Sequence, residues 1–180
     1  MLIPNLLDED YAKAIRNLVD NNSFPWYFYD NIVSGKKNEV SGFIHMLFFN
    51  TEVESTGFDF FKPLIKTFVD KAKDYNIIVK SLHRIQINLM VSQDLTNEKK
   101  TNNKHVDMNK ECPGKFISFI YYIDDSDGDT IVYDDNNNEI ERVTPKRNAC
   151  LFFNSKNLHE GTPPIKSKKR MVINCILSIE

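Results

Sequence analysis

Residues 116–133 read FISFIYYIDDSDGDTIVY, and this stretch decides the fold prediction. Two short runs rich in aromatic and β-branched residues, 116–123 and 130–133, flank a cluster of Asp, Ser and Gly. This composition is typical of two strands joined by a turn. The same alternation of short apolar runs and turn-forming clusters begins at residue 83 and continues to the end of the chain. Further strands are expected over 83–91, 139–143, 149–153 and 170–179.

The residues before this β-rich part predict two amphipathic helices. Apolar side chains recur at helical spacing from Leu7 to Val19, with Leu18 among them, and again from Phe61 to Ala72. Another strand is expected between the helices, over 43–49.

Short antiparallel strands that follow helices favour a mainly β protein with a double-stranded β-helix, or jelly-roll, core and with the helices on one outer face. A sandwich of another topology is the main alternative. A chain of 180 residues is long enough for one domain with a real core. We expect one domain over 1–180, with a helical N-terminal part over about 1–80 and the jelly-roll core over about 81–180.

Composition and charge exclude several classes of protein. Hydrophobic residues make up 41% of the chain and the formal net charge is -2, so neither disorder nor binding based on broad phosphate neutralisation is indicated. The N-terminus lacks the pattern of a secretory signal, and no apolar run has the roughly 20 residues of a membrane helix. The three cysteines are widely spaced, which predicts reduced thiols in a cytoplasmic protein.

Three side chains form a candidate metal site. His105 and Asp107 stand two positions apart after the polar stretch 92–104, which we predict to be a mobile loop, and on extended backbone both point to one face. Alone, this triplet is more often a loop histidine and a turn-forming aspartate. His159 follows at a distance that can return the chain to the same mouth of a jelly roll. Two imidazoles and one carboxylate suit an Fe(II) oxygenase, whereas zinc usually prefers a closed or single-vacancy site.

The last expected strand adds an independent clue. Arg170, Val172 and Asn174 share one of its faces, and an arginine on a largely apolar strand needs a partner. A guanidinium offers a fixed fork for a carboxylate, so a dicarboxylate whose other end chelates the metal would supply that partner. His45 and His83 have no such pattern and are interpreted as structural residues, and residues 166–169 as a solvated basic loop.

Several features together carry a resemblance to a known family. An apolar strand, Phe119-Ile-Tyr-Tyr-Ile123, follows the H-x-D triplet, and Gly128-Asp129-Thr130 is similar to a G-G-x-T turn. Residues 145–153 are similar to a P-x-x-G-x-hydrophobic-F-F strand, and the ending runs from His159 to Arg170-Met-Val-Ile-Asn174. Over about 82–179 the chain resembles the Fe(II)- and 2-oxoglutarate-dependent oxygenases. Within them it resembles the prolyl 4-hydroxylase-like branch, in the small form that bacteria and bacteriophages encode.

Carried over residue by residue, the resemblance implies that His105, Asp107 and His159 bind Fe(II). It also implies that Arg170 pairs with the distal carboxylate of 2-oxoglutarate, that Tyr122 donates its hydroxyl to that carboxylate, and that Asn174 is a weaker cofactor contact. Tyr122 is equally consistent with a core aromatic, and Lys169 is an alternative to Arg170. The chain departs from the family pattern at three positions, which are Met90 in place of a tyrosine and Asp127 and Asn148 in place of glycines.

The function that the resemblance implies is dioxygen-dependent hydroxylation of a C–H bond, with 2-oxoglutarate converted to succinate and CO2 and with ascorbate supporting activity. The favoured substrate is proline in a peptide or protein. A nucleic-acid base or a free amino acid is the alternative substrate, although no clear basic stripe interleaved with aromatics favours nucleic acid. A non-catalytic jelly-roll binding module is the alternative from another class. The expected location is the cytoplasm of a bacterium or of a phage-infected host, and the oligomeric state is left open.

Overall fold

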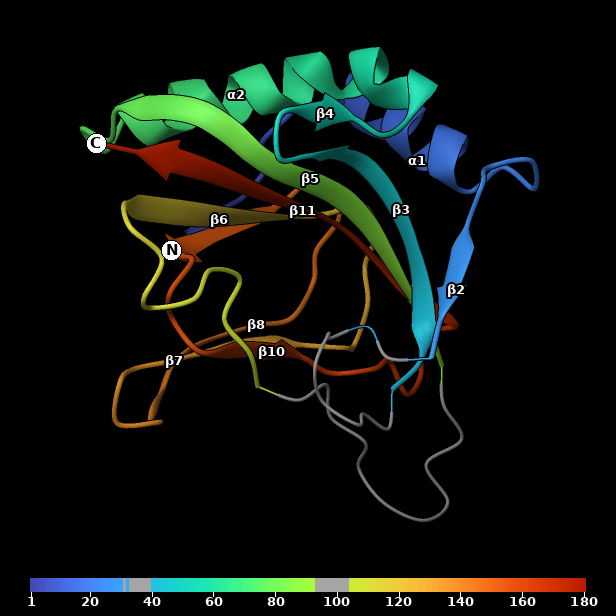
Figure 1. The fold of residues 1–180 in the computed structure, drawn as a ribbon. Helices are drawn as coiled ribbons and strands as arrows, with labels where there is room; N and C mark the ends of the chain where they lie inside the picture. The colour runs from blue at the N-terminus through green and yellow to red at the C-terminus, as the bar shows by residue number, and fades with distance from the viewer. Residues whose placement is uncertain (31, 33–39, 93–103) are drawn as a thin grey trace.

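Two antiparallel sheets lie one above the other, and two helices cover the outer face of the larger sheet (Figure 1). The computed structural model describes residues 1–30, 32, 40–92 and 104–180. The helices are α1 (Glu9–Val19) and α2 (Lys62–Lys73), and a 3-10 helix, η1 (Thr56–Phe61), leads into α2. The strands are β1 (Leu2–Ile3), β2 (Tyr27–Tyr29), β3 (Gly42–Phe49), β4 (Glu52–Val53), β5 (Val79–Val91), β6 (Lys115–Tyr122), β7 (Thr130–Tyr133), β8 (Glu139–Val143), β9 (Cys150–Asn154), β10 (His159–Gly161) and β11 (Lys169–Ile179).

The strand order is that of the predicted jelly roll. The major sheet runs β1-β9-β6-β11-β5-β3-β2, with β4 paired to β3, and the minor sheet runs β10-β7-β8. Strands that are neighbours in the major sheet come from distant parts of the chain, so β11 pairs with β5 on one side and with β6 on the other. The double-stranded β-helix prediction is therefore confirmed, although the first 80 residues supply strands as well as helices.

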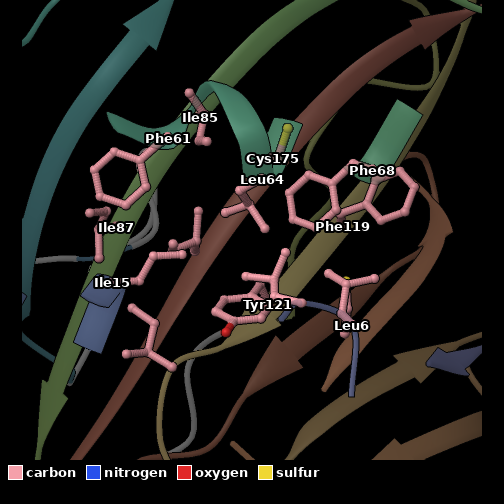
Figure 2. Close-up of a cluster of buried hydrophobic side chains, with 14 of the residues drawn as sticks. Leu6, Ile15, Phe61, Leu64, Phe68, Ile85, Ile87, Phe119, Tyr121 and Cys175 are labelled. Carbon is pink, nitrogen blue, oxygen red and sulfur yellow. The ribbon is translucent and has the colours of Figure 1, made fainter. Parts of the chain in front are cut away.

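The principal core lies between the helices and the major sheet (Figure 2). Ile15 of α1 and Leu64 and Phe68 of α2 are fully buried, and the ring of Phe68 stacks on that of Phe119 with centroids 4.7 Å apart. Burying one such side chain stabilises the fold by about 1.5–3 kcal/mol. The helical spacing predicted this packing, with one error: Leu18 is exposed, and Ala12 lies in the core instead.

Both helices begin where the sequence indicates. The side chain of Asp8 caps α1 by accepting a hydrogen bond from the Asp10 amide at 2.9 Å. Pro63 lies in the first turn of α2, where its missing N–H costs nothing.

A second core fills the space between the two sheets. Strand β6 is buried on both faces, because Phe119 and Tyr121 face the helices while Ile120 and Tyr122 belong to the inter-sheet cluster with Val172. A strand enclosed on both sides reads as a nearly continuous apolar run, and residues 116–123 show such a run, interrupted by Ser118. A polar side chain in this apolar inter-sheet space therefore needs a hydrogen-bond partner or a ligand.

Asn148, where the family pattern often has glycine, has a structural explanation. Its backbone φ is 62°, a left-handed conformation that asparagine tolerates better than most residues. Its side-chain amide accepts a hydrogen bond from the Leu7 amide and donates one to the Leu7 carbonyl, each at 2.9 Å. Asn148 thus makes the turn that a glycine would make and also fastens the segment before α1.

Four short strands were not predicted, namely β1, β2, β4 and β10. The predicted mobile loop at 92–104 falls almost entirely outside the described residues. Among the described helices, none is long and apolar enough to cross a membrane. The three cysteines are free thiols, as predicted, and Cys150 and Cys175 are buried.

Candidate active site

Three side chains far apart in the sequence converge at the mouth between the sheets. His105 and His159 form an isolated β-bridge, with each backbone amide donating to the other residue's carbonyl at 2.9 and 2.8 Å. This bridge places the two imidazole rings 4.3 Å apart between centroids. One ligand atom each from His105, Asp107 and His159 lies within 4.8 Å of the others. The structure thus brings together the three residues that the sequence singled out.

Backbone contacts orient His159. Its Nδ1 lies 3.1 Å from the carbonyl oxygen of Asn157, and a carbonyl only accepts, so Nδ1 carries the proton in the neutral ring. The lone pair of that tautomer is on Nε2, which lies 3.7 Å from Oδ2 of Asp107. The ring therefore presents an unprotonated nitrogen towards the carboxylate, as a metal-binding histidine does when its other ring nitrogen donates to a backbone carbonyl.

Asp107 is held by three donors. Arg84 Nη2 donates to Oδ1 at 2.7 Å, the Ser118 hydroxyl donates to Oδ2 at 2.6 Å, and the Asn174 amide lies 3.2 Å from Oδ1. Burial alone would raise the pKa of this carboxyl. Electrostatic interactions with His159, Arg84 and His105, together with the Ser118 hydrogen bond, instead hold the pKa well below its usual range. Asp107 is thus a fixed carboxylate at neutral pH.

Arg170 supplies a buried positive charge in the same pocket. Its Nε donates to the Gly128 carbonyl at 2.9 Å and its Nη2 donates to the Thr130 hydroxyl at 2.6 Å. Among the described residues no carboxylate forms an ion pair with it, although Arg170 is only 5% exposed. Burial lowers the pKa of the guanidinium, with a smaller opposing effect from Tyr122 and Asp129. A buried cation without an anion is costly unless a ligand completes the pair.

Two glycines make room for this arginine. A Cβ on Gly161 would lie 3.2 Å from Arg170 Nη1, and a Cβ on Gly128 would lie 2.9 Å from Arg170 Cδ and 2.4 Å from the Thr162 carbonyl. Gly128 therefore needs the smallest residue, whereas a Cβ at Gly161 would require the Arg170 guanidinium to shift by a few tenths of an ångström. The side chain of Lys169, the alternative at this step, pairs instead with Asp20 after the last turn of α1. Lys169 lies outside the pocket, so the geometry favours Arg170.

The pocket has a volume of about 210 Å³ and contains both the three-residue cluster and Arg170. Asn174 lines it with its amide on Asp107, and its Oδ1 is buried without a hydrogen-bond partner in the described structure. Met90 also lines the pocket at the position where the family pattern has a tyrosine. Tyr122 is not among the residues that line the pocket: it lies in the inter-sheet core and is fully buried, and its hydroxyl interacts with Thr130 and Arg170. Burial raises the pKa of this phenol, so it keeps its proton and can donate.

The remaining histidines lie elsewhere. His45 is hydrogen-bonded to the Pro25 carbonyl at 2.8 Å and to the Ser55 hydroxyl at 2.9 Å, while His83 packs against aromatic rings. Neither belongs to the metal-capable cluster, so the prediction that they are structural agrees with their contacts.

Sequence reasoning missed Arg84 and Ser118. Ser118 is the one small polar residue in the run FISFIYYI, and strand alternation with Tyr122 places it on the inter-sheet face, so that pattern could have identified it. Arg84 stands in a strand of mixed polarity, and its contact with Asp107 depends on tertiary structure alone.

The donor set and its surroundings fit an Fe(II) centre with a dicarboxylate. Two imidazoles and one carboxylate on one side leave coordination positions open for a chelating ligand and dioxygen. Within the described part of the chain no carboxylate pairs with Arg170, so its charge suits the far carboxylate of such a ligand.

Comparisons with known proteins point to the family that this site chemistry suggests. Residues 89–178, half of the chain, match the family model described as the 2OG-Fe(II) oxygenase superfamily. A prolyl hydroxylase from Trichoplax adhaerens, solved with a hypoxia-inducible-factor peptide, superposes with a TM-score of 0.71 at 16% identity over 99% of this chain and 82% of that one. A prolyl-4-hydroxylase from Pseudomonas putida superposes with a TM-score of 0.65 at 10% identity, over 100% and 91% of the two chains.

A different reaction type shares the same fold. The α-ketoglutarate-dependent epimerase SnoN of nogalamycin biosynthesis superposes with a TM-score of 0.69 at 12% identity, over 98% of this chain and 76% of that one. No curated protein matches the sequence. The structural similarities show the fold, and the family match over half of the sequence shows the relationship. The chain therefore belongs to the 2OG-Fe(II) oxygenase superfamily.

Proposed function

We propose that this protein is an Fe(II)- and 2-oxoglutarate-dependent dioxygenase that hydroxylates a prolyl residue in a peptide or protein, and that residues 1–180 act as one oxygenase domain in the cytoplasm. One observation carries the proposal: a His-Asp-His cluster lines the same small pocket as a buried arginine that has no carboxylate partner among the described residues. In this proposal His105, Asp107 and His159 bind the metal, and Arg170 binds the distal carboxylate of 2-oxoglutarate.

The bound iron, with 2-oxoglutarate and dioxygen, supplies the oxidant for an unactivated C–H bond, and the co-substrate leaves as succinate and CO2. The protein's own residues bind and orient. Ser118, Arg84 and Asn174 fix the Asp107 carboxylate, and the Asn157 carbonyl fixes the tautomer of His159. Tyr122 adds a second donor beside Arg170, and ascorbate serves to keep the iron reduced.

The prolyl substrate rests on two kinds of support. The sequence motifs are most similar to those of the prolyl-hydroxylase branch, and the Trichoplax and Pseudomonas proteins with this fold are described as prolyl hydroxylases, the first in complex with a peptide. Because an epimerase has the same fold, the reaction outcome needs a direct product analysis.

The test is to incubate the purified protein with Fe(II), ascorbate, oxygen and labelled 2-oxoglutarate, with and without proline-rich peptides. Succinate is quantified, and mass spectrometry searches the peptides for an added oxygen. His105→Ala is expected to abolish succinate formation, whereas His83→Ala, a histidine outside the cluster, is expected to retain it. Succinate formation without peptide oxidation would contradict the proposed prolyl substrate. The absence of succinate from the wild type would contradict the proposed dioxygenase activity itself.

A further inference from the structure

One face of β5 presents a row of polar side chains to the pocket. Strand alternation places Arg84, Gln86 and Asn88 on the same face, and all three line the pocket with the metal-capable cluster. The row runs along β5 from Arg84 towards Met90. Met90 pairs with Arg170 of the neighbouring strand β11. Arg84 is thus six positions along the strand from the level of Arg170, or roughly 20 Å at about 3.3 Å per residue.

Arg84 uses few of its hydrogen-bond donors. Its Nη2 donates to Asp107, but its Nε is buried and has no partner in the described part of the chain. The side chain is 21% exposed, so the cation is largely removed from water. A buried donor without an acceptor is unfavourable, and a ligand oxygen would relieve it.

The two neighbouring amides extend this pattern. Gln86 Nε2 donates to Asn88 Oδ1 at 2.9 Å, and among the described residues the Gln86 oxygen and the Asn88 NH2 group are left for a ligand. Together with Arg84, the row then offers donor, acceptor and donor along the strand. A peptide backbone, with its alternating carbonyl and N–H groups, or an amino acid matches that order.

We propose that Arg84, Gln86 and Asn88 form the subsite that holds the primary substrate, and that Arg84 donates to a carbonyl or carboxylate oxygen of the amino-acid residue to be oxidised. This inference rests on the proposed function, in which Arg170 is occupied by 2-oxoglutarate and Arg84 is left for the second substrate. Arg84 is in addition a positioning residue, because it holds Asp107.

The experiment measures binding rather than turnover. Protein loaded with Zn(II) and 2-oxoglutarate is titrated with N-acetyl-L-proline N-methylamide, N-acetyl-L-proline and free L-proline, and binding is followed by saturation-transfer NMR. The variants are Arg84→Met and Gln86→Met, and the matched control is Lys80→Met, an exposed cation on the same strand. Because Arg84 also supports Asp107, Gln86→Met tests the row without touching the metal cluster.

Arg84→Met is expected to weaken probe binding by at least about 10-fold, the size of one hydrogen bond to a charged group, and Gln86→Met by about 2- to 10-fold. Lys80→Met is expected to bind like the wild type, and 2-oxoglutarate affinity is expected to be unchanged in Gln86→Met. Binding of the neutral amide would identify a peptide carbonyl as the oxygen. Binding of only the two acids would identify a carboxylate and a free amino acid.

Two results would overturn the subsite: equal probe affinity in the wild type and both variants, or no probe binding by wild-type protein that does bind 2-oxoglutarate. If the wild type fails to bind 2-oxoglutarate, the proposed function fails instead, so the two failures are distinguishable.

Discussion

Replacing Arg170 with methionine tests the cofactor anchor. A guanidinium has five N–H groups, of which two donate to Gly128 and Thr130, so the others are available to a ligand. A carboxylate bound by two of them gains about 1.5–3 kcal/mol from each, or about 3–6 kcal/mol together. Arg170→Met is therefore expected to raise the dissociation constant of 2-oxoglutarate by at least about 100-fold.

Thermal unfolding with and without 2-oxoglutarate, in the presence of Mn(II), measures this loss. At a ligand concentration about 100 times its dissociation constant, the wild type gains about 2.7 kcal/mol, which raises the Tm by roughly 5–10 °C for a chain of this size. Arg170→Met is expected to show almost no ligand-dependent shift. Each protein is compared with itself, so a change in intrinsic stability cancels.

Lys169→Met is the matched control, because it removes the same charge one residue away, from a side chain paired with Asp20. It is expected to keep the full shift. A normal shift in Arg170→Met, or a lost shift in Lys169→Met, would refute the assignment of Arg170.

Three further predictions concern the support of the site and the fold. Ser118→Ala removes a hydrogen bond to Asp107 and is expected to weaken Fe(II) binding by about 10- to 100-fold in anaerobic dialysis, with an unchanged circular dichroism spectrum. Asn148→Ala loses two hydrogen bonds to Leu7 and places a Cβ residue at positive φ, so chemical denaturation is expected to show about 2–4 kcal/mol of destabilisation, and Asn148→Gly less. Asp127 accepts backbone N–H groups of Ile165, Lys166 and Ser167. Burial alone would raise the pKa of Asp127, but these hydrogen bonds to its carboxylate outweigh burial. The folded-state pKa of Asp127 therefore lies below its usual 3.8. Its contribution to stability is complete above pH 3.8 and is lost as the pH falls towards the folded-state pKa, and Asp127→Asn is expected to flatten the acid limb of the stability profile between about pH 4 and pH 2.

The parts of the fold that could be predicted are those in which local pattern and tertiary environment agree. β7 and β8 coincide with the predicted 130–133 and 139–143, because turn-forming clusters bound them on both sides. β10 was not predicted, since a three-residue strand ending in Gly161 has no local signal and forms only by pairing with β7. β2 was not predicted for a similar reason, because it is defined by its pairing with β3.

The residues of the site likewise divide into those that the sequence could predict and those that it could not. His105, Asp107 and His159 were predicted because their chemistry is specific and their positions suit a jelly roll, and the structure does bring them together. Arg84 could not be predicted, since a residue 23 positions before Asp107 meets it only after β5 and the segment that follows have folded. The neighbours of a site are fixed by strand register across the sheet, which a single sequence does not display.

Metal binding tests the central claim most directly. Purified protein, stripped of metal, is dialysed anaerobically against Fe(II) with 2-oxoglutarate, and bound iron is measured for the wild type, His105→Ala, Asp107→Asn, His159→Ala and His83→Ala. The account predicts about one iron per chain for the wild type and His83→Ala, and little or none for the other three variants. Full iron binding by any one of those three, or its loss in His83→Ala, would contradict it.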